Sequence, residues 1–168
     1  FYNKNENTSY HKAIDFMQFL NNYIQKESKN KNGKILEYGC ATGFNLRYLR
    51  NEGHDNLYGM DGFKTFIDIA RQVSVYDDIW YQCINFNTHR IDFSNEYDFI
   101  FTRGVLQQGK TEGEFIKNTD DNILNIFYNF YNMLSKDGLL IINEGEVRNW
   151  ADMAGKRGFK LKDKIKKK

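Results

Sequence analysis

The chain has 168 residues, 40% hydrophobic and 16% aromatic, which predicts one folded domain and argues against a disordered chain. Its formal net charge of +2 gives no general reason to expect a nucleic acid or a membrane surface as partner. No apolar run approaches the roughly 20 residues that a membrane-spanning helix needs, so we expect no span.

The two cysteines, Cys40 and Cys83, lie far apart in apolar segments, and only three histidines accompany them. This pattern predicts reduced, buried thiols in a cytoplasmic protein, with neither a disulfide framework nor a metal site. The first ten residues lack both a signal-peptide pattern and an initiating Met, so we expect a trimmed chain.

Apolar residues at helical spacing predict a first helix over residues 9–29, with Ser9 as its candidate N-cap. The short apolar run 34–38 then predicts a buried strand. The remaining expected elements are, in chain order, a helix at 45–53 capped by Gly53, a strand at 57–61, a helix at 64–73, strands at 78–86 and 97–102, a helix at 120–136 capped by Asp120 or Asp121, and a strand at 139–145.

This alternation of apolar strands and helices predicts an α/β fold with a mostly parallel, twisted sheet and helices on both faces. Ligands of such sheets bind beyond the carboxyl ends of the strands, near the point where the strand order reverses. The segments expected around that crevice are 37–45, 61–63, 85–89 and 102–108.

The turn after the first strand reads Gly39-Cys40-Ala41-Thr42-Gly43. A dinucleotide fingerprint would have glycine in place of Ala41 and Phe44, and a phosphate-binding P-loop would have Lys after Gly43. Glu37 adds a negative charge, which would repel a diphosphate and suits a positively charged ligand.

The second strand ends at Asp61, where a carboxylate can accept hydrogen bonds from both hydroxyls of a ribose. Gly62 lets the chain turn, and Phe63 could pack on a base. The alternative is that Asp61 serves only as a helix cap.

Four segments together, "ILEYGCATGFNLRYL", "LYGMDGFKTFIDIAR", "YDFIFTRGVLQQ" and "NMLSKDGLLII", resemble a class I S-adenosylmethionine-dependent methyltransferase over about residues 30–145. The resemblance implies a Rossmann-like fold, S-adenosylmethionine as cofactor, S-adenosylhomocysteine as product, and methyl transfer to a small-molecule or sugar acceptor mainly by positioning. The cofactor-binding residues that it implies are Glu37, Gly39, Cys40, Ala41, Gly43, Asn45, Asp61, Gly62, Phe63, Asn87, Thr88, Thr102 and Arg103.

The sequence departs from the family pattern at two places. Asn87 replaces the usual Asp that binds the adenine amino group, although an amide oxygen also accepts hydrogen bonds. Gln107 and Gln108 stand where several members have a histidine, so the catalytic residue stays unassigned. The candidates are Tyr10, His11, His89 and Arg103; the alternatives are an exposed helix residue for His11, a loop residue for His89 and a structural ion pair for Arg103.

We expect a single domain over residues 1–168, with an N-terminal helical lid (1–30), a cofactor-binding core (34–145) and a short basic segment (146–168). The last segment predicts one short helix and one strand at 159–165, so the closing hairpin of the family is expected to be incomplete or missing.

The alternative to a methyltransferase is a non-catalytic cofactor- or partner-binding domain of the same fold. Phe44 and Glu37 disfavour a nicotinamide-dependent oxidoreductase. The polar stretch 21–34 lacks interleaved aromatic residues for stacking on bases, which disfavours nucleic acid binding.

Overall fold

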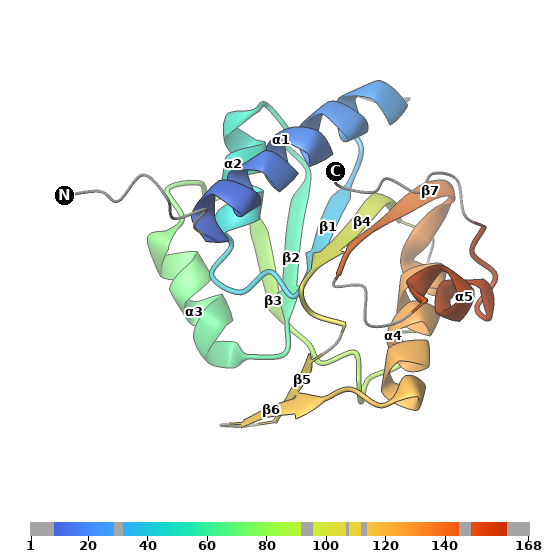
Figure 1. Cartoon of the computed structure of the whole chain (residues 1–168). Helices are drawn as coiled ribbons and strands as arrows, with labels where there is room; N and C mark the ends of the chain where they lie inside the picture. Colours follow the sequence, from blue (N-terminus) through green and yellow to red (C-terminus); the bar gives the residue numbers. More distant parts are fainter. Residues whose placement is uncertain are drawn as a thin grey trace.

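The structure is a computed structural model that describes residues 9–28, 32–91, 96–106, 108–111, 114–144 and 149–160. Its centre is a five-stranded sheet in the order β3-β2-β1-β4-β7, in which every neighbouring pair is parallel (Figure 1). The strands are β1 (Ile35–Tyr38), β2 (Leu57–Asp61), β3 (Trp80–Cys83), β4 (Tyr97–Arg103) and β7 (Leu134–Asn143). The predicted α/β, Rossmann-like architecture is confirmed.

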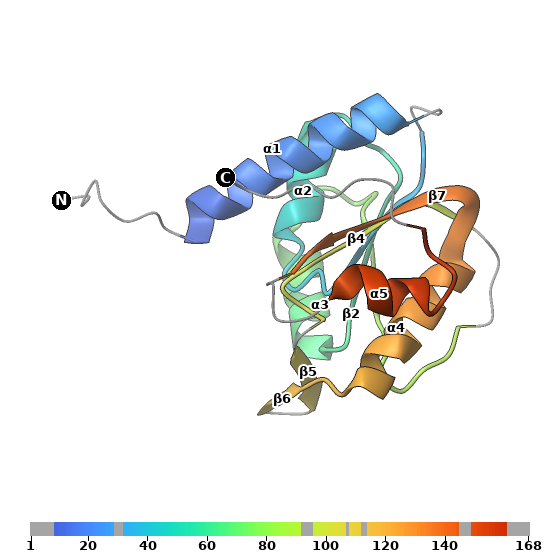
Figure 2. The ribbon, with the colours of Figure 1, turned by 45° about the vertical axis from the view of Figure 1, so that its right-hand side comes forward.

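Helices cover both faces of this sheet (Figures 1 and 2). The helices α1 (Ser9–Glu27), α2 (Phe44–Asn51) and α3 (Lys64–Val73) pack on one face, and α4 (Asp120–Met133) and α5 (Trp150–Gly155) on the other. Successive strand residues point to opposite faces, so Ile35 is buried under α1–α3 and Leu36 under α4. This is why the strands read as continuous apolar runs in the sequence.

Several element ends differ from the predictions. Helix α4 is capped by the Thr119 side chain, which accepts the Asn122 N–H at 3.2 Å, so the expectation of an Asp120 or Asp121 cap is wrong. The same helix stops at Met133, because the chain enters β7 at once. The cap of α2 is Glu52, with the predicted Gly53 following it at φ +93°.

A small antiparallel pair, β5 (Gln108–Thr111) with β6 (Glu114–Lys117), was not predicted from the sequence. It lies beyond the carboxyl ends of the parallel strands, below the sheet in Figures 1 and 2. The strand predicted at 159–165 is not found at residues 159–160, and residues 161–165 lie outside the described part of the chain.

Asparagines on α4 hold the connection that leads from β3 to β4. Asn129 is fully buried; its oxygen accepts the Ile91 N–H at 2.9 Å and its amide donates to the His89 carbonyl at 2.8 Å. Asn125 donates to the Phe86 carbonyl at 2.7 Å. Residues 84–91 form no helix, and these side chains satisfy backbone groups that a helix would have paired internally.

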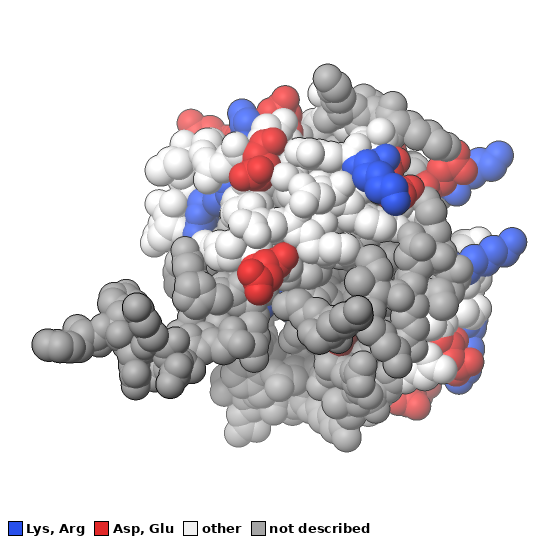
Figure 3. All heavy atoms as spheres, turned by 45° about the horizontal axis from the view of Figure 1, so that its top comes forward, with Lys and Arg blue, Asp and Glu red and all other residues white. Residues whose placement is uncertain are grey.

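The surface of the described residues is mixed in charge. On the face in Figure 3, acidic and basic side chains lie among uncharged ones, some singly and some side by side. None of the described helices has the length and apolar character required to cross a membrane. Cys40 is buried as predicted, whereas Cys83 is exposed because it ends the outer strand β3, so the prediction of two buried thiols is wrong for Cys83.

Candidate functional site

The glycine turn connects β1 to α2 through three residues in the left-handed region. Gly39 has φ +77°, Ala41 φ +46° and Gly43 φ +75°. A Cβ on Gly39 would lie 2.2 Å from Val105 Cγ2, and one on Gly43 would lie 2.3 Å from the Tyr81 hydroxyl. Both glycines are therefore required by backbone conformation and by close neighbours.

Asp61 joins this turn to the next one along the sheet. Its Oδ2 accepts the Ala41 N–H at 3.0 Å, and its Oδ1 accepts the Phe63 N–H at 2.9 Å. The carboxylate therefore braces the turns that follow β1 and β2. Each oxygen keeps further acceptor capacity for a ligand, since a carboxylate offers about four lone-pair sites.

Glu37 lies inside β1 and is only 2% exposed. Its Oε1 accepts a hydrogen bond from Asn45 of α2 at 2.5 Å, whereas its buried Oε2 has no hydrogen-bond partner within the described residues. Burial raises the pKa of Glu37 to about 8; the Asn45 amide opposes this rise, Asp61 adds to it and Arg103 opposes it. An unpaired buried acceptor of this kind is suited to a cationic donor.

Burial also raises the pKa values of Tyr38 and Cys40 beside Glu37. For Cys40, the neighbouring Glu37 and Asp61 carboxyl groups increase the effect, because a thiolate there would lie near two negative charges. The Cys40 thiol is therefore kept neutral, and its contribution to the site is packing.

The predicted adenine-binding segment reaches the site through Asn85 and Asn87. Gly62 and Asn85 are neighbours, since a Cβ on Gly62 would lie 3.7 Å from Asn85 Cβ. Asn87 donates its amide to Asn118 Oδ1 at 2.9 Å, and this leaves its buried Oδ1 as an acceptor with no partner among the described residues. Asn87 stands where the family often has Asp, and it still offers an acceptor oxygen through its amide carbonyl.

At the end of β4, Thr102 is fully buried and donates its hydroxyl to Glu144 Oε1 at 3.4 Å. Thr102 pairs in register with Tyr38 of β1, so it lies at the same edge of the sheet as the glycine turn. The Arg103 guanidinium lies 5.8 Å from the ring centre of Phe16 on α1, and no carboxylate in the described part of the chain forms an ion pair with it.

Other sequence candidates are not brought into this cluster. Thr88 and His89 are both exposed. Their side-chain hydrogen bonds in the described structure are to each other and, for Thr88, to the Asn85 carbonyl. Tyr10 and His11 lie in α1, but their side chains are outside the described set, as are those of Gln107 and Gln108.

Sequence reasoning missed four residues that shape the site: Tyr81, Val105, Asn118 and Glu144. Glu144 lies near the carboxyl end of the predicted fifth strand, 139–145, where an acidic residue could have been noticed. The others carry no local signal, because their partners Gly43, Gly39 and Asn87 lie between 31 and 66 positions away in the chain.

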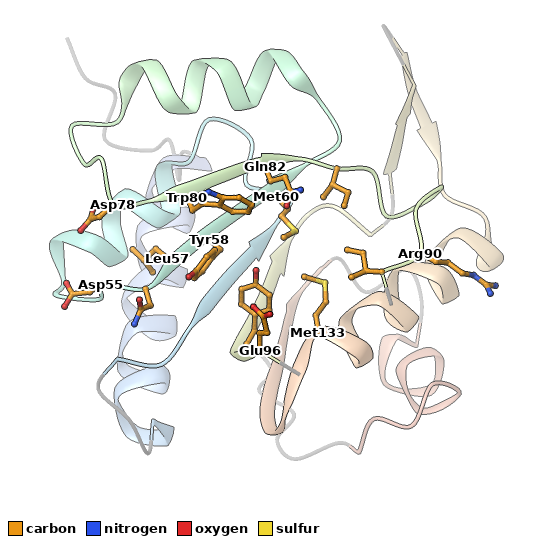
Figure 4. A pocket seen from close by; sticks show the side chains of 14 residues that line it. Asp55, Leu57, Tyr58, Met60, Asp78, Trp80, Gln82, Arg90, Glu96 and Met133 are labelled. Carbon is orange, nitrogen blue, oxygen red and sulfur yellow. The ribbon is translucent and has the colours of Figure 1, made fainter. Parts of the chain in front are cut away.

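The described part of the chain also has a cavity of about 860 Å³ along β2 and β3, on the face that carries α4. Figure 4 shows Tyr58, Trp80 and Met133 among its lining side chains. None of the predicted cofactor residues lines it. It runs beside the β3–β4 connection, where the described residues 84–91 form no covering helix.

The site therefore presents acceptor oxygens around a sharp glycine turn and offers no set of metal ligands. Within the described residues, no group of three or more His, Cys, Asp or Glu side chains is placed to hold a metal ion. Such an arrangement can bind a ligand that carries several hydrogen-bond donors and a positive charge.

A family model described as a methyltransferase domain matches residues 6–158 of the chain. No curated protein matches the chain in sequence. The fold is similar to a putative sarcosine dimethylglycine methyltransferase from Galdieria sulphuraria (TM-score 0.65, 15% identity, covering 86% of this chain and 60% of that one).

Two further solved structures share the fold. One is a TehB-like SAM-dependent methyltransferase from Corynebacterium glutamicum (TM-score 0.63, 20% identity, covering 91% of this chain and 86% of that one). The other is the PH0226 protein from Pyrococcus horikoshii (TM-score 0.63, 17% identity, covering 84% and 60%). The chain therefore spans less than two thirds of the length of the Pyrococcus and Galdieria proteins.

Proposed function

Since the chain belongs to the class I S-adenosylmethionine-dependent methyltransferase family, we propose that it transfers a methyl group to a small-molecule or sugar acceptor. The observation that carries this proposal is the set of unused acceptor oxygens around the glycine turn: Glu37 Oε2, Asn87 Oδ1 and the spare lone pairs of Asp61. They match the hydrogen-bond donors of the family's cofactor.

The residues present fit S-adenosylmethionine group by group. The Glu37 carboxyl, beside the glycine turn, is suited to the ammonium group of the methionine end. Asp61 is suited to the ribose hydroxyls, with Gly62 and Phe63 beside the adenosine. Asn87 is suited to the adenine amino group, because its amide nitrogen already donates to Asn118 and its oxygen has no partner among the described residues.

When bound, the cofactor would supply a methyl group for in-line transfer: the acceptor atom bonds to the methyl carbon as the carbon–sulfur bond breaks, and S-adenosylhomocysteine leaves. The chain contributes by holding the acceptor near that methyl group and by excluding water from it. Thr102 and Arg103, at the carboxyl end of β4, are the described residues that we assign to the acceptor side. Arg103 forms no ion pair at contact distance in the described structure, which suits an acceptor with an anionic group.

The catalytic base remains open between Tyr10, His11 and His89, and transfer by positioning alone requires none of them. We assign the helical lid to residues 1–30, the cofactor-binding core to 34–145 and a basic terminal segment to 146–168. The position of α1 beside Arg103, through Phe16, supports the lid assignment.

Calorimetric titration with S-adenosylhomocysteine, NAD and NADP tests the cofactor. We expect S-adenosylhomocysteine to bind and both nicotinamide dinucleotides to fail, and the absence of S-adenosylhomocysteine binding would end this proposal. Transfer of a labelled methyl group to panels of sugars, amines and phenols then tests the acceptor. Binding without any transfer would favour the alternative, a non-catalytic domain of the same fold.

A further inference from the structure

Glu144 is a largely buried carboxyl group that the proposed cofactor contacts do not use. It follows β7 directly and lies beside the end of β4. Its Oε1 accepts the Val105 N–H at 2.8 Å and the Thr102 hydroxyl at 3.4 Å. Its Oε2 is buried and has no hydrogen-bond partner in the described part of the chain.

The backbone at the end of β4 needs this carboxyl group. Gly104 turns the chain with φ +66° and donates its N–H to the Asn143 carbonyl at 3.1 Å. The next N–H, that of Val105, points away from the strand ladder and would lose its acceptor without Glu144. Glu144 therefore fixes the direction in which Val105 leaves the turn.

Val105 in turn packs on the first glycine of the cofactor turn. Its Cγ2 occupies the space in which a Cβ on Gly39 would lie, at 2.2 Å. Gly39 is also tied to β2, since its N–H donates to the Met60 carbonyl at 2.7 Å. A continuous line of contacts thus runs from Glu144 through Val105 to Gly39.

We propose that Glu144 is a positioning residue that sets the cofactor-binding turn by holding Val105 against Gly39. One side chain then fixes both the end of β4, where the acceptor is received, and the glycine turn. This inference rests on the proposed cofactor site. Because a neutral carboxyl or an amide also offers an oxygen to the Val105 N–H, the role depends on the hydrogen bond and does not require a negative charge.

The test is the affinity for S-adenosylhomocysteine of the whole chain and of four variants: Glu144→Ala, Glu144→Gln, Val105→Ala and the double alanine variant. We expect Glu144→Ala to weaken binding about tenfold, as loss of one hydrogen bond can do, and Glu144→Gln to stay within about threefold of the wild type. Because Glu144 acts through Val105, the two alanine effects should be clearly less than additive.

Asp98 offers a matched control at the opposite edge of the same strands. Its Oδ2 accepts the Lys34 N–H at 2.9 Å, a carboxylate-to-backbone bond like that of Glu144 but at the amino end of β4. We expect Asp98→Ala to lower the thermal unfolding temperature and to leave the affinity for S-adenosylhomocysteine unchanged.

Unchanged affinity in Glu144→Ala, equal weakening in Glu144→Gln, or fully additive effects would overturn the positioning role. If Glu144→Ala does not fold, Val105→Ala decides, and wild-type affinity in that variant would overturn the proposal. A wild-type chain that binds no S-adenosylhomocysteine would instead overturn the proposed function, and this inference with it.

Discussion

Glu37 Oε1 accepts a hydrogen bond from Asn45 Nδ2 at 2.5 Å, while the other oxygen of the same buried carboxyl group meets no donor among the described residues. The group is thus half-satisfied within β1. Burial is the main reason why its pKa rises from 4.5 to about 8. Either protonation of Glu37 or binding of a cation would remove the energetic cost of a buried carboxylate oxygen that has no hydrogen-bond donor.

The first prediction concerns stability against pH. Between the unfolded pKa of 4.5 and the folded pKa of about 8, the folded chain keeps a proton on Glu37 that the unfolded chain has lost. The folded state then binds more protons, so its stability falls as pH rises through this window. Glu37→Gln should lose less stability than the wild type between about pH 5 and pH 8, as measured by urea unfolding at both ends. Parallel losses in the two proteins would contradict the raised pKa.

The second prediction concerns proton release on binding. A cationic ligand group beside Glu37 stabilises the carboxylate, so the pKa of Glu37 should fall when S-adenosylhomocysteine, which carries the α-ammonium group, binds. At pH 7 this releases up to about one proton. The apparent binding enthalpy should therefore differ between phosphate and Tris buffers for the wild type and agree for Glu37→Gln. Equal enthalpies for the wild type would argue that Glu37 does not face the ammonium group.

The third prediction concerns Asp61. Its replacement by Ala removes the acceptors of the Ala41 and Phe63 N–H groups and, under the proposed assignment, the charge-assisted hydrogen bonds to the ribose. Affinity for S-adenosylhomocysteine should fall by about 1.5–3 kcal/mol, measured by calorimetry. Asp68→Ala is the control, because Asp68 is a partly exposed carboxylate of α3 that pairs only with Lys64 in the described structure. Equal affinities in the two variants would show that the assignment of Asp61 is wrong.

The fourth prediction compares two glycines with left-handed backbone. Gly43→Ala should cost about 1–2 kcal/mol of backbone strain and add a clash with the buried Tyr81, whereas Gly53→Ala, with open space around it, should incur strain alone. Urea unfolding should therefore rank Gly43→Ala as the less stable. Only that variant should lose S-adenosylhomocysteine binding. Similar behaviour of both variants would rule out close contact between the turn and Tyr81.

The fifth prediction concerns the asparagines of α4. Asn129→Ala leaves the Ile91 N–H and the His89 carbonyl without their partners in a buried environment, so the free energy of unfolding should fall by about 2–4 kcal/mol. Asn125→Ala should lower the free energy of unfolding by a smaller amount than Asn129→Ala, because Asn125 is only partly buried. Equal costs in denaturant unfolding would argue against a special role for Asn129.

Much of the site could be predicted because its parts are local. Glycines 39 and 43 are close in sequence to Glu37 and Asn45, and the parallel order of β1 and β2 brings Asp61 to Ala41. Thr88 and His89 were predicted near the crevice for the same reason. Their side chains face solvent because Asn125 and Asn129 hold the backbone of that loop, and no local pattern encodes this orientation.

By itself, the sequence determined the alternation of strands and helices. Short continuous apolar runs predict strands that are buried on both faces, and apolar residues at a period of about 3.6 predict amphipathic helices. It also determined the glycine turn and the carboxylates of Glu37 within β1 and Asp61 at the end of β2. Only the tertiary structure decided that Thr119 caps α4, that Gln108–Thr111 pairs with Glu114–Lys117, and that Glu144 reaches Gly39 through Val105. The cap of α4 could not be predicted because neighbouring residues have similar propensities as helix caps. The other features depend on hydrogen bonds and contacts between residues whose separation along the chain follows no periodic pattern.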